Sequence, residues 1–230
     1  MFRRALVTIA FAVHVCVLAA AGNSHTSVGI NLTDGQILID RQQEIALALQ
    51  AAPVHLRKDA TVYVFTKHGY EKVRTGSNGF NCMVNRDGLQ NGDDSVHPTC
   101  WDPEGSRTIL PLMLRVGELL AQDKSAAEIK QEIDEGFARG RFHSPAKAGI
   151  AYMLAGDVKF DRKSGRLSTT EFPAHYMFYA PGVTNSEIGV SDDALKLTPG
   201  LPFVYSGYSG DIRTAYIIVT ANQNAAHLSH

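Results

Sequence analysis

Apolar residues recur every three or four positions in three stretches of the chain, the spacing that buries one face of a helix. These stretches cover residues 38–52, 109–120 and 129–137. A hydroxyl residue followed three positions later by Gln or Glu precedes two of them, at Thr33 and at Ser125, which is the pattern of a capping box. The pattern therefore predicts three helices.

Strands are predicted where β-branched and aromatic residues run between turn-forming residues. Residues 61–66 and 70–74 flank a short turn and predict a β-hairpin. Further strands are predicted at residues 79–84, 149–154, 158–160, 167–172, 175–180, 203–205 and 214–220. Residues 85–106 and 185–200 show no clear period and are predicted to be long connections.

The order of these elements decides the fold class. The helices are clustered in sequence and do not alternate with the strands, which favours an α+β fold over a doubly wound α/β fold. We expect a mainly antiparallel sheet with about three helices packed on one face. The apolar fraction of 44% fits a single globular domain over residues 36–220, preceded by a flexible segment at 22–35 and followed by a disordered tail at 221–230.

The N-terminal segment has the three parts of a secretory signal peptide. Arg3 and Arg4 precede an apolar run over residues 5–18, and Ala19 and Ala21 supply the small residues of a cleavage site. The apolar run is shorter than the roughly 20 residues that span a bilayer. We therefore expect residues 1–21 to be removed, no integral membrane segment after that cleavage, and a periplasmic or secreted protein.

Export changes how the cysteines are interpreted. Removal of residues 1–21 takes Cys16 away and leaves Cys82 and Cys100, 18 positions apart. Two thiols in an oxidising compartment predict a disulfide, which would remove chain entropy worth roughly 3 kcal/mol from the unfolded state. The alternative, a zinc site or a catalytic thiol, lacks the clustered ligands that zinc requires.

Charge and motifs exclude several functional classes. The formal net charge of the 230-residue chain is −1, and it becomes −3 when Arg3 and Arg4 leave with the signal peptide. Such a chain has no general attraction for nucleic acid or anionic membranes. The sequence contains no Gly-rich phosphate loop and no H-E-x-x-H motif. We expect no nucleic-acid partner and no cofactor.

The first candidate site is a polar cluster before the second predicted helix. Asp102 and Glu104 are two positions apart, so in an extended loop their carboxylates would point the same way, where they could bind a cation or act as a base. Arg107 could then hold an anion. The alternative is structural, since acidic residues before a helix complement its dipole and Arg107 would neutralise them.

The second candidate site is His175, which lies at the start of a predicted strand among aromatic residues. A histidine there could act as a general base or bind a metal, with His97 and His143 as companions. The alternative is a core histidine whose hydrogen bonds go to the backbone, and apolar neighbours would lower its pKa by desolvation.

Four runs of the sequence resemble a group of bacterial exported proteins that have no assigned activity. These runs are NGFNC, CWDPEGSRTILP, GIAYML and HYMFYAPGVTN. The resemblance covers roughly residues 36–220 and implies a bacterial envelope or secreted protein. It implies no activity, fold or catalytic residue.

Two functional hypotheses follow. The first is an exported domain that binds a small-molecule ligand or an envelope component, with aromatic strands lining a pocket. Its candidate ligand-binding residues are Trp101, Tyr152, Tyr179 and Asn185. The second is a small hydrolase or lyase in which His175 is the base, Asp102 or Glu104 orients it, and Arg107 binds an anionic substrate.

Overall fold

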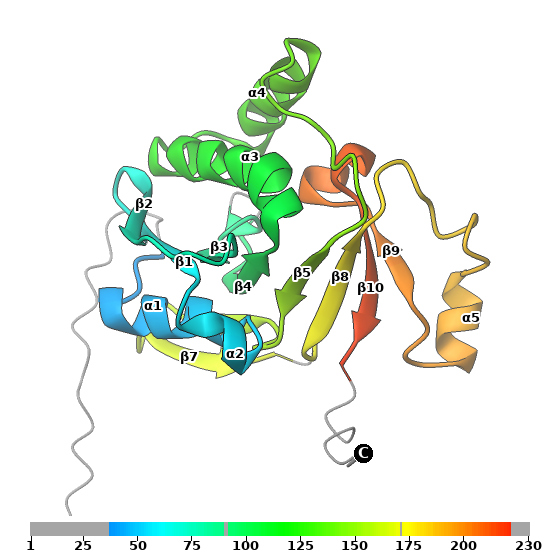
Figure 1. Ribbon diagram of the computed structural model, residues 1–230, viewed down its shortest axis with the longest axis horizontal. Helices are drawn as coiled ribbons and strands as arrows, with labels where there is room; N and C mark the ends of the chain where they lie inside the picture. The colour runs from blue at the N-terminus through cyan, green and yellow to red at the C-terminus, as the bar shows by residue number, and fades with distance from the viewer. Residues whose placement is uncertain (1–36, 90–91, 171, 222–230) are drawn as a thin grey trace, which may run out of the picture.

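The computed structural model describes residues 37–89, 92–170 and 172–221. These residues fold around a ten-stranded sheet (Figure 1). Eight strands pair in the order β2 (Gly69–Arg74), β1 (Thr61–Thr66), β3 (Asn81–Asn85), β4 (Ser95–Trp101), β5 (Ile150–Met153), β8 (His175–Tyr179), β10 (Tyr216–Thr220) and β9 (Phe203–Tyr205). The hairpin β6 (Val158–Asp161) and β7 (Arg166–Thr169) joins the start of β4. Among the strands of the described residues, only β1 and β3 pair in parallel. The predicted α+β class and mainly antiparallel sheet are therefore confirmed.

Helices cover both faces of this sheet, whereas the sequence pattern predicted one face. Figure 1 shows α3 (Pro103–Ala121) on one side and α1 (Arg41–Gln50) with α2 (Val54–Arg57) on the other. The reason lies in β1, which is buried on both of its faces. Val62 packs in the cluster that contains α1, whereas Tyr63 and Phe65 pack in the cluster that contains α3. A strand that is apolar on both faces needs cover on both.

The other α-helices of the described residues are α4 (Ala126–Ala138) and α5 (Asp192–Leu197), and two short 3₁₀ helices, Tyr208–Gly210 and Ile212–Thr214, follow β9. The predicted capping box of Ser125 and Glu128 is present at the start of α4. Asp40 caps α1, while the capping box predicted at Thr33 lies outside the described residues, as do the predicted signal peptide and the segment 22–35. The short helix α5 lies inside the predicted loop 185–200, and the side chain of Ser191 caps it.

The predicted disulfide between Cys82 and Cys100 is confirmed. The two residues are direct cross-strand partners in β3 and β4, with Cα atoms 4.0 Å apart. The bond therefore joins two neighbouring strands. The prediction of an irregular connection over residues 85–106 is wrong, because residues 95–101 form β4.

Pro98 explains why β4 is hard to recognise in the sequence, because proline lacks the N–H that a strand donates to its neighbour. Along its second edge β4 pairs with β6 at Ser95 and Val96, and with β5 at Cys100 and Trp101. Pro98 lies between these two pairings, where no ladder bond on that edge is lost.

A buried ion pair ties α1 to the sheet. The side chains of Arg86 and Glu44 are both completely buried and are 2.8 Å apart. Arg86 also donates to the carbonyl oxygens of Ile37 and Val84, and Glu44 accepts from the backbone N–H of Phe65. These bonds satisfy both charged groups inside the protein.

Within the described ranges, no helix combines the length and the apolar character needed to cross a membrane.

Candidate functional site

A cavity of about 280 Å³ lies on the α3 face of the sheet. Its lining residues come from α3, from six strands of the sheet and from the loops beside them. They are Asn85, Asp87, His97, Thr99, Trp101, Ile109, Met113, Met153, Asp157, Phe172, His175, Met177, Phe203, Tyr205, Tyr208, Tyr216 and Ile218. Most of these side chains are aromatic or apolar, and the polar ones are few, which is typical of small-molecule sites.

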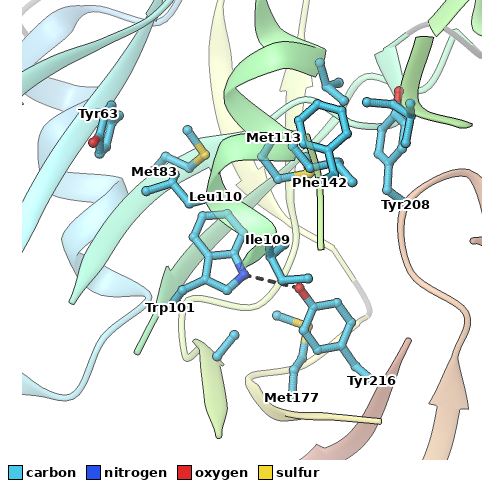
Figure 2. Packing of buried hydrophobic residues seen from close by; sticks show 14 of the residues in the cluster. Tyr63, Met83, Trp101, Ile109, Leu110, Met113, Phe142, Met177, Tyr208 and Tyr216 are labelled. Atoms are coloured by element: carbon cyan, nitrogen blue, oxygen red, sulfur yellow. Dashed lines mark hydrogen bonds between the residues drawn. The ribbon is translucent and has the colours of Figure 1, made fainter. Parts of the chain in front are cut away.

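Trp101 forms the apolar wall beneath α3. Its indole N–H donates to the hydroxyl oxygen of Tyr216 across 3.2 Å, and Figure 2 shows Ile109 and Met177 beside the same pair. Trp101 comes from β4 and Tyr216 from β10, so this hydrogen bond spans β5 and β8. The wall is thus fixed by a bond as well as by packing.

A charged cluster forms the polar end of the cavity. Nδ1 of His97 lies 3.0 Å from Oδ1 of Asp157, and its Nε2 lies 3.7 Å from Oδ1 of Asp87. Burial by itself lowers the pKa of His97, but the carboxylates of Asp87 and Asp157, with a smaller contribution from Asp93, outweigh it and raise the pKa to about 9. His97 is therefore an imidazolium ion at neutral pH.

Asn85 supplies a buried acceptor to the cavity. The hydroxyl of Thr99 donates to the backbone oxygen of His97, at 3.0 Å, so its oxygen accepts from Nδ2 of Asn85, at 3.1 Å. This relay sets the orientation of the amide. Asn85 is only 5% exposed, and its Oδ1 is buried. This oxygen nevertheless accepts no hydrogen bond from the described residues. Such a group is costly to bury without a partner, and a ligand is one way to provide it.

His175 is almost completely buried, with 1% of its surface exposed, and it lines the same cavity. Its Nδ1 donates to the backbone oxygen of Pro173 over 2.8 Å, and the ring packs edge-on against Phe172. Burial lowers its pKa. The imidazole is neutral at neutral pH, with Nε2 as an acceptor.

The structure does not bring Asp102 to His175, so the predicted pairing of these two residues is not formed. Asp102 caps α3 by accepting from the backbone N–H of Gly105 at 2.9 Å. It also accepts from the N–H of Ile150 at 2.9 Å and from the hydroxyl of Tyr179 at 2.8 Å. Asp102 is absent from the cavity lining, so its role is structural.

Glu104 and Arg107 also have structural roles. Both oxygens of Glu104 accept from Nη2 of Arg107, at 2.8 and 2.7 Å, and one also accepts from the N–H of Ala146 at 2.7 Å. The bonds from Arg107 and Ala146 lower the pKa of Glu104. This arrangement matches the structural alternative, in which Arg107 neutralises acidic residues at the start of a helix.

Three of the four predicted ligand-binding residues lie outside the cavity lining. Trp101 lines the cavity, but Tyr152 packs against Phe80 and Tyr176 near the opposite face. Tyr179 donates to Asp102 and to the oxygen of Ile150. The side chain of Asn185 bonds both the N–H and the C=O of Val204, which holds β9 in place.

The metal hypothesis based on His97, His143 and His175 receives no support from the described residues. They include no group of three or more His, Cys, Asp or Glu side chains placed to hold a metal ion. His143 is exposed and does not line the cavity. The two nitrogens of His97 face different carboxylates, so these groups do not converge on one point.

Sequence reasoning missed Asn85, Asp87, Asp157 and most of the aromatic wall. One local signal was available. His97, Thr99 and Trp101 alternate along residues 95–101, so a strand there would place all three on one face. Treating this segment as a loop concealed that face. No local signal places Asp157 beside His97, since 60 positions separate them.

Comparison with protein-family models, curated protein sequences and solved structures finds no significant match to this chain. The geometry of the cavity is therefore the evidence on its function.

Proposed function

We propose that this protein is an exported binding protein that holds a small molecule in the cavity beneath α3. The apolar body of the ligand would lie against Trp101 and the neighbouring rings, and its polar group would meet Asn85 and the His97 cluster. One observation carries the proposal. An aromatic cavity has its polar groups gathered at one end, where the buried Oδ1 of Asn85 accepts no hydrogen bond from the described residues.

Two features support export to the periplasm or the cell exterior. Residues 1–21 have the basic, apolar and small-residue regions of a signal peptide. The disulfide between Cys82 and Cys100 is of the kind that persists in oxidising compartments.

The contacts of the two cavity histidines favour binding over the hydrolase or lyase alternative. A general base must be unprotonated at the working pH, whereas His97 has a pKa of about 9. His175 is neutral, but Nδ1 donates to a backbone oxygen and no carboxylate of the described residues orients it.

Trp101 makes this proposal directly testable, because it is the only tryptophan of the chain and lines the cavity. Titration of the purified protein with the neutral probe 2-phenylethanol should change its fluorescence saturably. Ile218→Phe, which adds bulk to the cavity lining, should weaken this binding about tenfold, equivalent to about 1.4 kcal/mol.

Ile217→Phe is the matched control, because Ile217 is adjacent on β10 and does not line the cavity. It should leave the affinity for 2-phenylethanol unchanged. The proposal is overturned if neither 2-phenylethanol nor its charged analogues, 2-phenylethylamine and phenylacetate, alter Trp101 fluorescence saturably. Equal weakening by both variants would likewise place the binding outside the cavity.

A further inference from the structure

Four of the side chains that line the cavity, those of Asn85, Asp87, Asp157 and His175, carry hydrogen-bond acceptors. Asn85 presents Oδ1, and the tautomer of His175 leaves Nε2 as an acceptor. Asp87 and Asp157 contribute carboxylates. The ring N–H groups of His97 are donors, but they already face those two carboxylates. A ligand that meets this end of the cavity must therefore bring donors of its own.

The charge of the cluster points the same way. Two carboxylates surround one imidazolium, so Asp87, Asp157 and His97 together carry a net charge of −1. Neither Lys nor Arg is among the described residues that line the cavity. The polar end therefore attracts cations and repels anions.

The negative charge of Asp87 also acts on the tyrosines that line the cavity, Tyr205, Tyr208 and Tyr216, which with Trp101 form its aromatic wall. Burial raises the pKa values of Tyr205, Tyr208 and Tyr216, and the negative charge of Asp87 raises them further. These hydroxyls therefore stay neutral. Aromatic faces attract cations through their quadrupoles, so the wall can accept a cationic group as well as an apolar body.

We propose that the cavity selects a small primary amine, bound as its ammonium ion, with an apolar body about the size of a phenylethyl group. This inference rests on the proposed binding function and assigns its ligand class. The ammonium would donate to Oδ1 of Asn85 and to the carboxylates of Asp87 and Asp157. A carboxylate ligand would face those same acidic groups, and a neutral alcohol would satisfy fewer acceptors.

Three probes of nearly equal size test this inference through Trp101 fluorescence: 2-phenylethylamine, 2-phenylethanol and phenylacetate. At pH 7 the first is a cation, the second is neutral and the third is an anion. We expect the amine to bind at least about tenfold more tightly than the alcohol, which corresponds to about 1.4 kcal/mol, and phenylacetate to bind most weakly.

The possible outcomes separate the two proposals. If the alcohol or phenylacetate binds as tightly as the amine, the ligand class is overturned and the binding function stands. If none of the three probes binds, both are overturned. A fourth probe, trimethyl(2-phenylethyl)ammonium, keeps the charge but has no N–H donor, so it should bind more weakly than the primary amine. Equal binding would show that charge alone is recognised and would overturn the primary-amine assignment.

Variants locate the recognition at the proposed acceptors. Asp87→Asn and Asp157→Asn should each lower the ratio of amine affinity to 2-phenylethanol affinity about tenfold, because each removes a negative charge that only the amine needs. Alcohol binding by the same variant shows that the cavity is still formed. Asp193→Asn is the matched control, since this carboxylate is exposed on α5 and pairs with Lys196. Equal loss of amine and alcohol binding would show a structural role for the two carboxylates and would overturn the inference.

Discussion

At the scale of single residues, the charge of His97 depends on two segments that are far apart in the sequence. Asp87 follows β3 and Asp157 precedes β6, and both carboxylates face the imidazole ring of His97 in β4. The sequence identified His97 only as a companion of His175. Its protonation follows from neighbours that no local pattern reveals.

This protonation predicts a pH dependence of stability. The folded-state pKa of His97, about 9, is above its ordinary value of 6.5, so its contribution is complete below pH 6.5 and is lost as the pH rises through 9. The free energy of unfolding in urea should therefore fall across this interval. His97→Gln should flatten the fall, while His143→Gln, at an exposed site outside the cavity lining, should preserve it. An unchanged slope in His97→Gln would contradict the assignment.

Asp102 shows the reverse case, in which a local pattern was sufficient. An acidic residue directly before a helix suggested a structural role, and Asp102 is the N-cap of α3. Tertiary structure adds the hydrogen bond from the hydroxyl of Tyr179. The ring of Tyr179 packs so closely against Gly105 and Gly149 that a Cβ atom at either position would clash with it. The same carboxylate that caps the helix thus holds β5 and β8 against it.

At the scale of elements, the ion pair of Arg86 and Glu44 connects α1 with β1 and with the end of β3. Glu44→Gln should destabilise the protein by about 3–5 kcal/mol, because it leaves the buried charge of Arg86 without a counterion. Lys196→Gln, which removes an exposed pair with Asp193, should have almost no effect. Urea unfolding measures both, and similar losses in the two variants would contradict the argument.

The disulfide acts at the same scale, because it joins β3 to β4. Next to it in sequence, on the opposite face, are Met83, Thr99 and Trp101, and the last two line the cavity. Replacing both Cys82 and Cys100 by Ala should lower the free energy of unfolding by about 2–5 kcal/mol.

Reductant provides the control for that measurement. It should destabilise the parent protein by a similar amount once the buried bond is reduced, and it should leave the double variant unchanged. Equal stability of the parent protein and the double variant would show that pairing of β3 with β4 does not depend on the bond.

At the scale of the whole molecule, the cavity exists because the helices on one face do not cover the entire sheet. α3 packs on β2, β3, β4 and β5, whereas cavity-lining residues also come from β8, β9 and β10 (Figure 1). Side chains of those three strands and α3 enclose the space between them. The opposite face is packed by α1 and the disulfide region and carries its own apolar cluster.

The proposed export can also be tested at this scale, on the full chain. In a bacterial host, cleavage after Ala21 should yield a mature protein that begins at Gly22, as measured by intact mass of the periplasmic fraction. Ala21→Leu should block cleavage, because the last position of the site requires a small residue. Ala20→Leu is the control, since the middle position tolerates other residues. Recovery of the uncleaved chain from the cytoplasm alone would contradict the prediction.

Sequence alone determined the α+β class, the hairpin of β1 and β2, the capping of α4 and the disulfide. These features depend on periodicity, on caps within a few positions and on the pairing of two cysteines. It misjudged β4 because Pro98 masks the strand. It placed the helices on one face because a short apolar run such as that of β1 does not by itself show that both faces of the strand are covered.

Only the tertiary structure decided the site. The cavity combines Asn85 from β3, His97 from β4, Asp157 directly before β6 and Tyr205 from β9. These residues are far apart in the sequence, and the pairing of the strands brings them together. Trp101 and His175 were recognised as candidates, but their partners were not. The partners of a side chain in a sheet are set by register and strand order, which depend on the whole fold.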